Sequence, residues 1–203
     1  GPPPMGECRA GVALLALSAA AVRAVGCSPA LPAYVKARDH WTQDEEIYED
    51  FETRIFIDAT LKTEDFRREY VKEYGRIFAL PEARQQGMLD AELAEHKELW
   101  VVVAAIFVNK IQWDYFDPAK GIWEVRLENG DAKRGRLVKA KKHDTDNPTW
   151  KALYPYIKPH DSLWEFQFER TDEDGAPLVA SGDELHLVIA GAPGRVGLTW
   201  RVP

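Results

Sequence analysis

Apolar and polar residues alternate along several stretches of this chain, and a period of two residues is typical of strands that bury one face. The first stretch covers residues 47–59, where most odd positions are apolar and most even positions are charged. Later stretches with the same period cover residues 123–128, 164–169, 185–189 and 196–202. Residues 134–141 are basic and follow a predicted two-residue hairpin turn at Asn129 and Gly130, which indicates a solvent-facing strand.

Residues 63–99 instead follow the helical period and lie between the first two predicted strands. Thr63 is a suitable N-cap, and Phe66 and Tyr70 begin an apolar helix face. Pro81 suits the first turn of a second helix. One face of that helix carries Leu89, Leu93, His96 and Trp100. We therefore predict a helical hairpin that packs on the sheet.

Together these patterns predict an α+β fold that is mainly β. We expect an antiparallel β-sandwich or open barrel of about seven strands, with the helical hairpin inserted at 63–99. Residues 100–108 are apolar at nearly every position, which predicts a central strand buried on both faces. Residues 46–203 form a single β-rich domain in this interpretation. Residues 28–45 contain two prolines and gain charge toward their end, so we expect a tether.

Composition narrows the class of protein. The chain has 203 residues, of which 45% are hydrophobic, and it carries 33 acidic against 26 basic side chains. This balance fits one globular domain and excludes a disordered or disulfide-stapled chain. A net charge of −7 argues against binding to nucleic acid, which needs a basic surface. Both cysteines, Cys8 and Cys27, precede the predicted domain, so we expect no disulfide within it.

The first residues have the organisation of a targeting signal. Residues 11–22 form an uncharged, mostly apolar run of 12 residues between Arg9 and Arg23. That length falls short of the ~20 residues that span a bilayer, but it matches the apolar region of a secretory signal peptide. An Ala-rich helix at the start of a cytosolic protein is the alternative interpretation.

The run ends in Ala24, Val25, Gly26 and Cys27, a sequence that resembles the lipobox of bacterial lipoproteins. The resemblance implies that Cys27 takes a diacylglycerol and that cleavage falls between Gly26 and Cys27. Ala24 stands where the family usually has leucine. In this interpretation residues 1–26 are a lipoprotein signal peptide, and residues 27–45 are the lipidated cysteine and the tether.

The resemblance also implies a location. Ser28, at the second mature position, points by the family's sorting rule to the outer membrane, with the domain facing the periplasm. Two or three acyl chains would hold a folded domain durably on a membrane, whereas one chain gives only marginal binding. Removal of residues 1–26 takes away Arg9, Arg23 and Glu7 and leaves a mature charge of −8.

Candidate chemistry is sparse. The sequence has no nucleophile elbow, no phosphate-binding glycine loop and no His-Glu-x-x-His motif. His96 lies on an apolar helix face with Glu92 one turn earlier, but a metal site there would need further carboxylates, and a histidine at the core edge is favoured. Tyr154 and Tyr156 lie among prolines and form either a contact surface or, as we favour, a lid. We assign no catalytic residue, metal or cofactor.

Three functions stay open. The first is a membrane-anchored envelope lipoprotein whose domain is a structural or protein-interaction module with a partner in the cell envelope. The second is a periplasmic module that binds a small molecule or metal through aromatic faces and His96. The third is a hydrolase whose residues converge only in the folded chain. A cleft in which His96 or His160 meets carboxylates would favour the third function.

Overall fold

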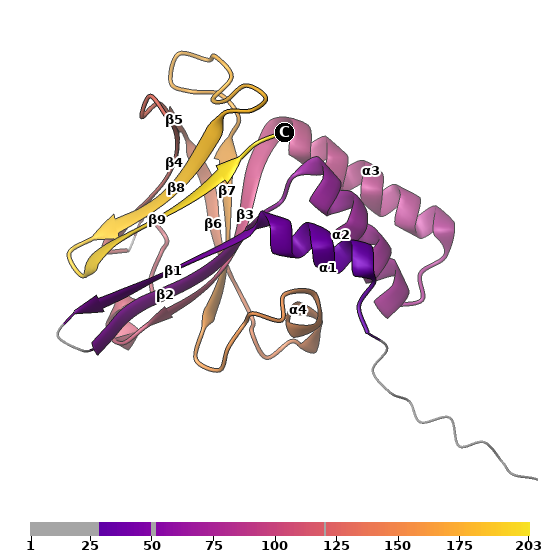
Figure 1. Cartoon of the computed structure of the whole chain (residues 1–203), viewed down its shortest axis with the longest axis horizontal. Coiled ribbons are helices and arrows are strands. Elements are labelled where there is room, and N and C mark those ends of the chain that lie inside the picture. The colour runs from indigo at the N-terminus through magenta and orange to yellow at the C-terminus, as the bar shows by residue number, and fades with distance from the viewer. Residues whose placement is uncertain (1–28, 50–51, 120) are drawn as a thin grey trace, which may run out of the picture.

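The computed structural model describes residues 29–49, 52–119 and 121–203 (Figure 1). The predicted signal peptide, Gly26 and Cys27 lie outside the described residues. Within the described ranges the helices are α1 Pro32–Trp41, α2 Glu64–Ile77, α3 Glu82–Glu98, the 3-10 turn η1 Ile111–Trp113 and α4 Pro148–Leu153. The strands are β1 Thr42–Glu49, β2 Glu52–Leu61, β3 Leu99–Val108, β4 Trp123–Asn129, β5 Arg134–Gly135, β6 Leu137–His143, β7 Ser162–Glu169, β8 Glu184–Gly191 and β9 Gly194–Arg201.

The strands form two antiparallel sheets, which confirms the predicted mainly-β sandwich with an inserted helical hairpin. One sheet has the order β1-β2-β3-β7-β6 and the other β5-β4-β8-β9. The sheets meet along one side, where the Gly197 amide of β9 donates a hydrogen bond to the Glu45 carboxylate of β1. On the other side the chain passes from β5 to β6, and so from one sheet to the other, at Arg136.

The main core lies between the two sheets. Ala59, Ala104 and Trp164 stand in register across β2, β3 and β7, and all are buried. From the loop before β4, the buried Phe116 ring lies 5.6 Å from the Trp123 ring and 5.6 Å from the Trp164 ring. Strand β3 is buried at positions 100–106, as its continuous apolar pattern predicts, because the second sheet covers one face and helices cover the other.

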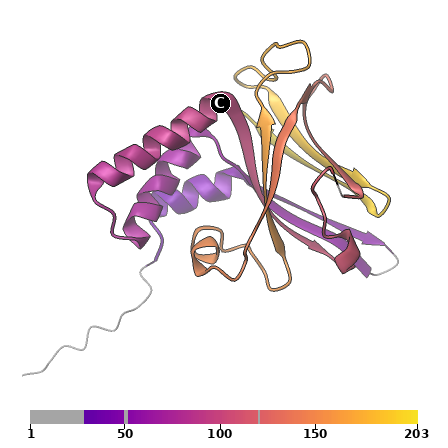
Figure 2. The ribbon, with the colours of Figure 1, turned by 180° about the vertical axis from the view of Figure 1, so that it is seen from behind.

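The helices cover the outer face of the five-stranded sheet (Figures 1 and 2). Helix α2 buries Phe66, Tyr70 and Val71 against this face, and α3 returns beside it. Helix α3 ends at Glu98, so Trp100 belongs to β3 and not to the helix face predicted for it. Among the described residues, no helix combines the length and apolarity needed to cross a lipid bilayer.

The expected tether at residues 28–45 is wrong for most of its length. Residues 32–41 form α1, and β1 starts at Thr42. Pro32 stands in the first turn of α1, where its missing N–H does no harm, so the proline starts a helix instead of preventing one. Tyr34 is fully buried, and the Trp200 indole donates a 2.9 Å hydrogen bond to the Trp41 carbonyl. The packed domain therefore begins at about Leu31.

Two strand predictions also need correction. The stretch predicted as one strand at 47–59 belongs to two paired strands, β1 and β2. The turn after β4 spans five residues, since the Asn129 amide donates to the Lys133 carbonyl at 3.0 Å and Ala132 adopts a φ of 59°. The basic stretch 134–141 divides into β5 and β6. Gly135 is required there because a Cβ would lie 2.5 Å from the Glu169 carbonyl oxygen.

Candidate functional site

A groove lined largely by aromatic side chains lies between α2, α3 and α4. We call it the aromatic groove. Its volume is about 500 Å³. It is lined by Tyr70, Tyr74, Phe78, Met88, Asn147, Thr149, Trp150 and Leu153. Such a volume accommodates a few side chains or a small organic molecule.

Helical spacing places the aromatic rings along one side of this groove. Tyr70, Tyr74 and Phe78 lie four residues apart on α2 and its C-cap, so they share one face. The Tyr70 and Tyr74 ring centroids are 6.1 Å apart, and those of Tyr74 and Phe78 are 4.5 Å apart. Phe78 is 43% exposed. The row of rings therefore runs from the core to the surface.

The opposite side of the groove is α4, a helix that the sequence analysis does not predict. Asn147 is its N-cap and accepts a 3.0 Å hydrogen bond from the Thr149 amide, and Pro148 follows in the first turn. This Asn-Pro pair was the sequence signal for the helix. Helix α4 brings Trp150 into the groove, where its ring stacks 5.8 Å from Tyr154.

Tyr154 and Tyr156 lie behind the groove. The Tyr154 ring is buried and packs 6.5 Å from Tyr70. Burial raises the pKa values of both phenols, so both stay protonated at neutral pH. The Tyr156 hydroxyl shares a 2.8 Å hydrogen bond with the Thr60 hydroxyl on β2. These tyrosines cover the outer face of the five-stranded sheet, so they resemble the lid more than an exposed contact surface.

A charged cluster lies beside the inner end of the groove, between the helical hairpin and the sheet. Its cations are Lys62 and the fully buried Arg67. Arg67 Nη1 lies 2.5 Å from Glu92 Oε2 and 2.7 Å from Glu95 Oε2, and Lys62 Nζ lies 3.0 Å from Glu92 Oε2. Lys62 Nζ also lies 5.4 Å from the Tyr70 ring centroid. The cluster therefore holds α3 against the start of α2 and supports the groove from within.

His143 and Glu165 extend this cluster toward α4. The His143 ring lies 4.5 Å from the Trp150 ring, and His143 Nε2 is 3.7 Å from Glu165 Oε2. Burial raises the pKa of Glu165, but its interactions with His143, Lys62 and Gln167 prevail and lower the pKa to about 2. Glu165 is therefore a carboxylate at any physiological pH, and it cannot serve as a proton donor.

His96 lies apart from this pair, at the end of α3. Burial and the guanidinium groups of Arg170 and Arg67 lower its pKa to about 4. Arg170 donates to the His96 carbonyl at 2.7 Å and stacks 3.6 Å from the Trp100 ring centroid. The expected neighbour Glu92 pairs with Arg67 and Lys62 instead. Two guanidinium groups outweigh the effect of Glu64 and Asp65 on His96. In the described ranges no three His, Cys, Asp or Glu side chains could hold a metal ion together.

His160 and Asp114 line the same pocket, but they do not form a hydrolytic site. His160 is exposed. Asp114 Oδ2 is paired with Lys142 Nζ at 2.5 Å, and Asp114 Oδ1 accepts a 2.5 Å hydrogen bond from the Ser162 hydroxyl. The carboxylate is therefore already engaged. This arrangement gives no support to the hydrolase interpretation.

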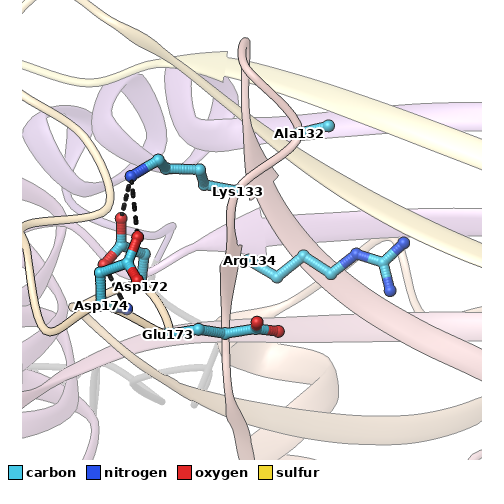
Figure 3. A pocket seen from close by; sticks show the side chains of 6 residues that line it. All are labelled: Ala132, Lys133, Arg134, Asp172, Glu173 and Asp174. Carbon is cyan, nitrogen blue, oxygen red and sulfur yellow. Dashed lines mark hydrogen bonds and ion pairs between the residues drawn. The ribbon is translucent and has the colours of Figure 1, made fainter.

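A second pocket of about 350 Å³ lies between the β4–β5 turn and the loop after β7 (Figure 3). Lys133 Nζ reaches Asp172 at 2.8 Å and Asp174 at 3.4 Å across this pocket. Asp172 also accepts hydrogen bonds from the Asp174 and Ala176 amides, so it shapes its own turn. Arg134 extends away from this group, toward Glu124. We call Lys133, Asp172 and Asp174 the clasp, because their ion pairs link the two turns. The charges of these three side chains are paired with one another.

No model of a known protein family matches the sequence, and no curated protein is similar to it at a significant level. The site therefore has to be interpreted from its own geometry. Of the candidates named from the sequence, Tyr154 is next to the aromatic groove, and Tyr156 lies behind it with its ring tilted, 5.8 Å from the Tyr154 ring. His96 belongs to a different part of the helix–sheet interface.

Proposed function

We propose that the protein is a lipid-anchored envelope lipoprotein whose domain binds a protein partner through the aromatic groove. The observation that carries the binding function is the groove itself, a preformed surface of aromatic rings between α2, α3 and α4. The anchor rests on the resemblance of residues 24–27 to a lipobox. Ser28 supports a place on the outer membrane, facing the periplasm.

Side-chain chemistry favours a protein partner for the groove. Tyrosine, phenylalanine, tryptophan and methionine are the residue types enriched at protein interfaces, and all four line this groove. The rings pack on one another, so little side-chain entropy is lost when a partner binds. No charged side chain lines the groove. The matching partner segment would bring two or three apolar or aromatic side chains.

Site-specific photocrosslinking in the producing bacterium tests this function. A benzophenone amino acid replaces Met88 in the full chain, inside the groove, and in a control replaces Val138, which is 46% exposed on β6. We expect a discrete protein adduct from position 88 that is absent from position 138. Trp150→Ala in the same chain should abolish it.

Three outcomes would contradict the proposed binding function. These are no protein adduct from position 88, the same adduct from both positions, and an adduct to lipid alone. A Trp150→Ala chain that keeps its adduct would show that the aromatic groove is not the surface involved. Protease resistance of the variant chain confirms that it remains folded during the comparison.

A further inference from the structure

We propose that the domain rests directly on the lipid surface and that the turn between α2 and α3 contacts the bilayer. This inference rests on the lipidation of Cys27 in the proposed function. We call residues 77–81, Ile-Phe-Ala-Leu-Pro, the apolar turn. The occupant of this surface is the bilayer that holds the protein's own anchor.

The first step is the short distance between the proposed anchor and the packed domain. The Leu31 amide donates a 3.1 Å hydrogen bond to Glu73 Oε2 on α2, and Tyr34 is fully buried three residues later. Three residues lie between Cys27 and Leu31, so the chain advances by four residue steps from one to the other. A fully extended chain spans at most about 3.6 Å per residue, so the backbone of Leu31 lies within about 14 Å of the backbone of Cys27. The domain has no long tether on which to rotate.

The second step is the position of the apolar turn at this same end. Glu73, which holds Leu31, precedes Ile77 by one helical turn. In both ribbon views the chain enters α1 beside the end of α2 and its turn into α3 (Figures 1 and 2). The anchor therefore keeps one end of the domain at the membrane surface, and this end carries residues 77–81.

The third step is the chemistry of that turn. All five residues are uncharged and apolar, and Phe78, Ala79 and Pro81 are exposed. The backbone is fixed, because the Leu80 amide donates to the Gly75 carbonyl at 2.9 Å and the Gln85 side chain donates to the Leu80 carbonyl at 2.9 Å. The amide and the carbonyl of Leu80 are therefore both paired. The exposed apolar side chains of the turn can enter the interfacial region of a bilayer, where water still hydrates the remaining backbone groups.

Charge decides the kind of contact. The mature chain carries −8, so anionic lipid headgroups repel it as a whole. Next to the turn, Arg76 is neutralised by Glu73 at 2.6 Å. Contact must therefore come from apolar burial and not from electrostatic attraction. Since Phe78 also lines the aromatic groove, the groove opens close to the lipid surface, and its protein partner would be a segment that lies near the membrane.

A fluorescent probe tests this contact in the lipidated protein. The chain carries two substitutions. Cys8→Ser removes the cysteine of the signal peptide, and Ala79→Cys provides the thiol for the probe. In the mature protein the Cys27 sulfur is alkylated, so position 79 offers the one free thiol. Ala132→Cys is the matched control, since Ala132 is also exposed in a turn with positive φ, 59° against 48° for Ala79.

The purified lipoproteins are reconstituted into phosphatidylethanolamine–phosphatidylglycerol vesicles that contain lipids with a nitroxide quencher. We expect an environment-sensitive probe at position 79 to shift to the blue and to lose fluorescence, while the probe at 132 does neither. Phe78→Ser should reverse the change at position 79. Raising salt from about 0.1 to about 1 M should not reverse it, because screening acts on charges.

The controls separate failure of this inference from failure of the proposed function. The Cys8→Ser chain without a second cysteine should show no reactive thiol after purification from membranes. A reactive thiol at Cys27 would overturn the lipidation and the inference with it. A blocked Cys27 together with equal quenching at 79 and 132, or none at 79, would overturn the membrane contact alone.

Discussion

At the scale of single residues, the buried guanidinium of Arg67 explains why α3 stays on the sheet although none of its residues is fully buried. Arg67 donates to the carboxylates of Glu92 and Glu95 and to the Glu92 carbonyl. Taking one partner from a buried ion pair leaves a charge without compensation, which is far more destabilising than the pair is stabilising. The apolar pattern of α3 contains no sign of this interaction.

We predict that Arg67→Met lowers the free energy of unfolding by about 3–5 kcal/mol, because Glu92 and Glu95 would stay half-buried beside Lys62 alone. The neighbouring Arg68→Met is the control. Arg68 is 46% exposed and pairs with Glu64 one turn earlier, so its loss should lower stability by less than about 1 kcal/mol. Urea denaturation of both variants measures the difference. Equal effects would contradict the structural role assigned to Arg67.

His96 should make stability depend on pH. Its pKa falls from an ordinary 6.5 to about 4 in the folded chain, so the unfolded chain binds a proton more readily. The contribution of neutral His96 is therefore present above about pH 6.5 and is lost as the pH falls toward 4. We expect an NMR titration midpoint near 4 for His96, and a smaller loss of stability in His96→Gln over this range. A midpoint near 6.5 would contradict the burial beside Arg170.

At the scale of elements, a strong apolar period predicts a helix or strand correctly, whereas a pattern that is short or shared by two elements does not. Residues 64–77 and 99–108 appear as a helix and a doubly buried strand because one repeating pattern covers each element. Helix α4 is not predicted from the sequence because its six residues are too few to show a helical period. The sequence predicts one strand where the structure has β5 and β6. Only Arg136 separates these two strands, so the passage from one sheet to the other lies inside one short, basic stretch.

The groove shows the same limit. The spacing of Tyr70, Tyr74 and Phe78 was visible, but a row of aromatics on one helix face usually indicates core. Whether such a row is covered or open depends on what packs opposite, and here that is α4, about 75 residues later in the chain. The partner elements are set by the tertiary fold and not by any local pattern.

Helix α1 gives the sharpest test at this scale. We predict that Tyr34→Ala destabilises the domain by about 3–5 kcal/mol, because it empties a fully buried aromatic site next to Phe66. Lys36→Ala, on the exposed side of the same helix, should change stability by less than about 0.5 kcal/mol. Thermal and urea unfolding provide the measurement. If residues 28–45 were a tether, neither substitution would matter.

At the scale of the whole molecule, the sandwich separates two ends. The chain enters at the end that carries the helices, the apolar turn and the aromatic groove, while the clasp of Lys133 with Asp172 and Asp174 lies at the end near β5 (Figures 1 and 3). A lipid at Cys27 would therefore orient the domain, with the groove near the membrane. In the proposed function, the orientation of the domain depends on this one covalent anchor.

Lipidation of Cys27 is the central claim, and metabolic labelling with an alkyne fatty acid tests it most directly. Cys27→Ala and Cys8→Ala are compared with the natural chain in the producing bacterium. We predict that the natural chain and Cys8→Ala are labelled equally and that Cys27→Ala is not labelled. Equal labelling of all three chains, or labelling of none, would contradict the account.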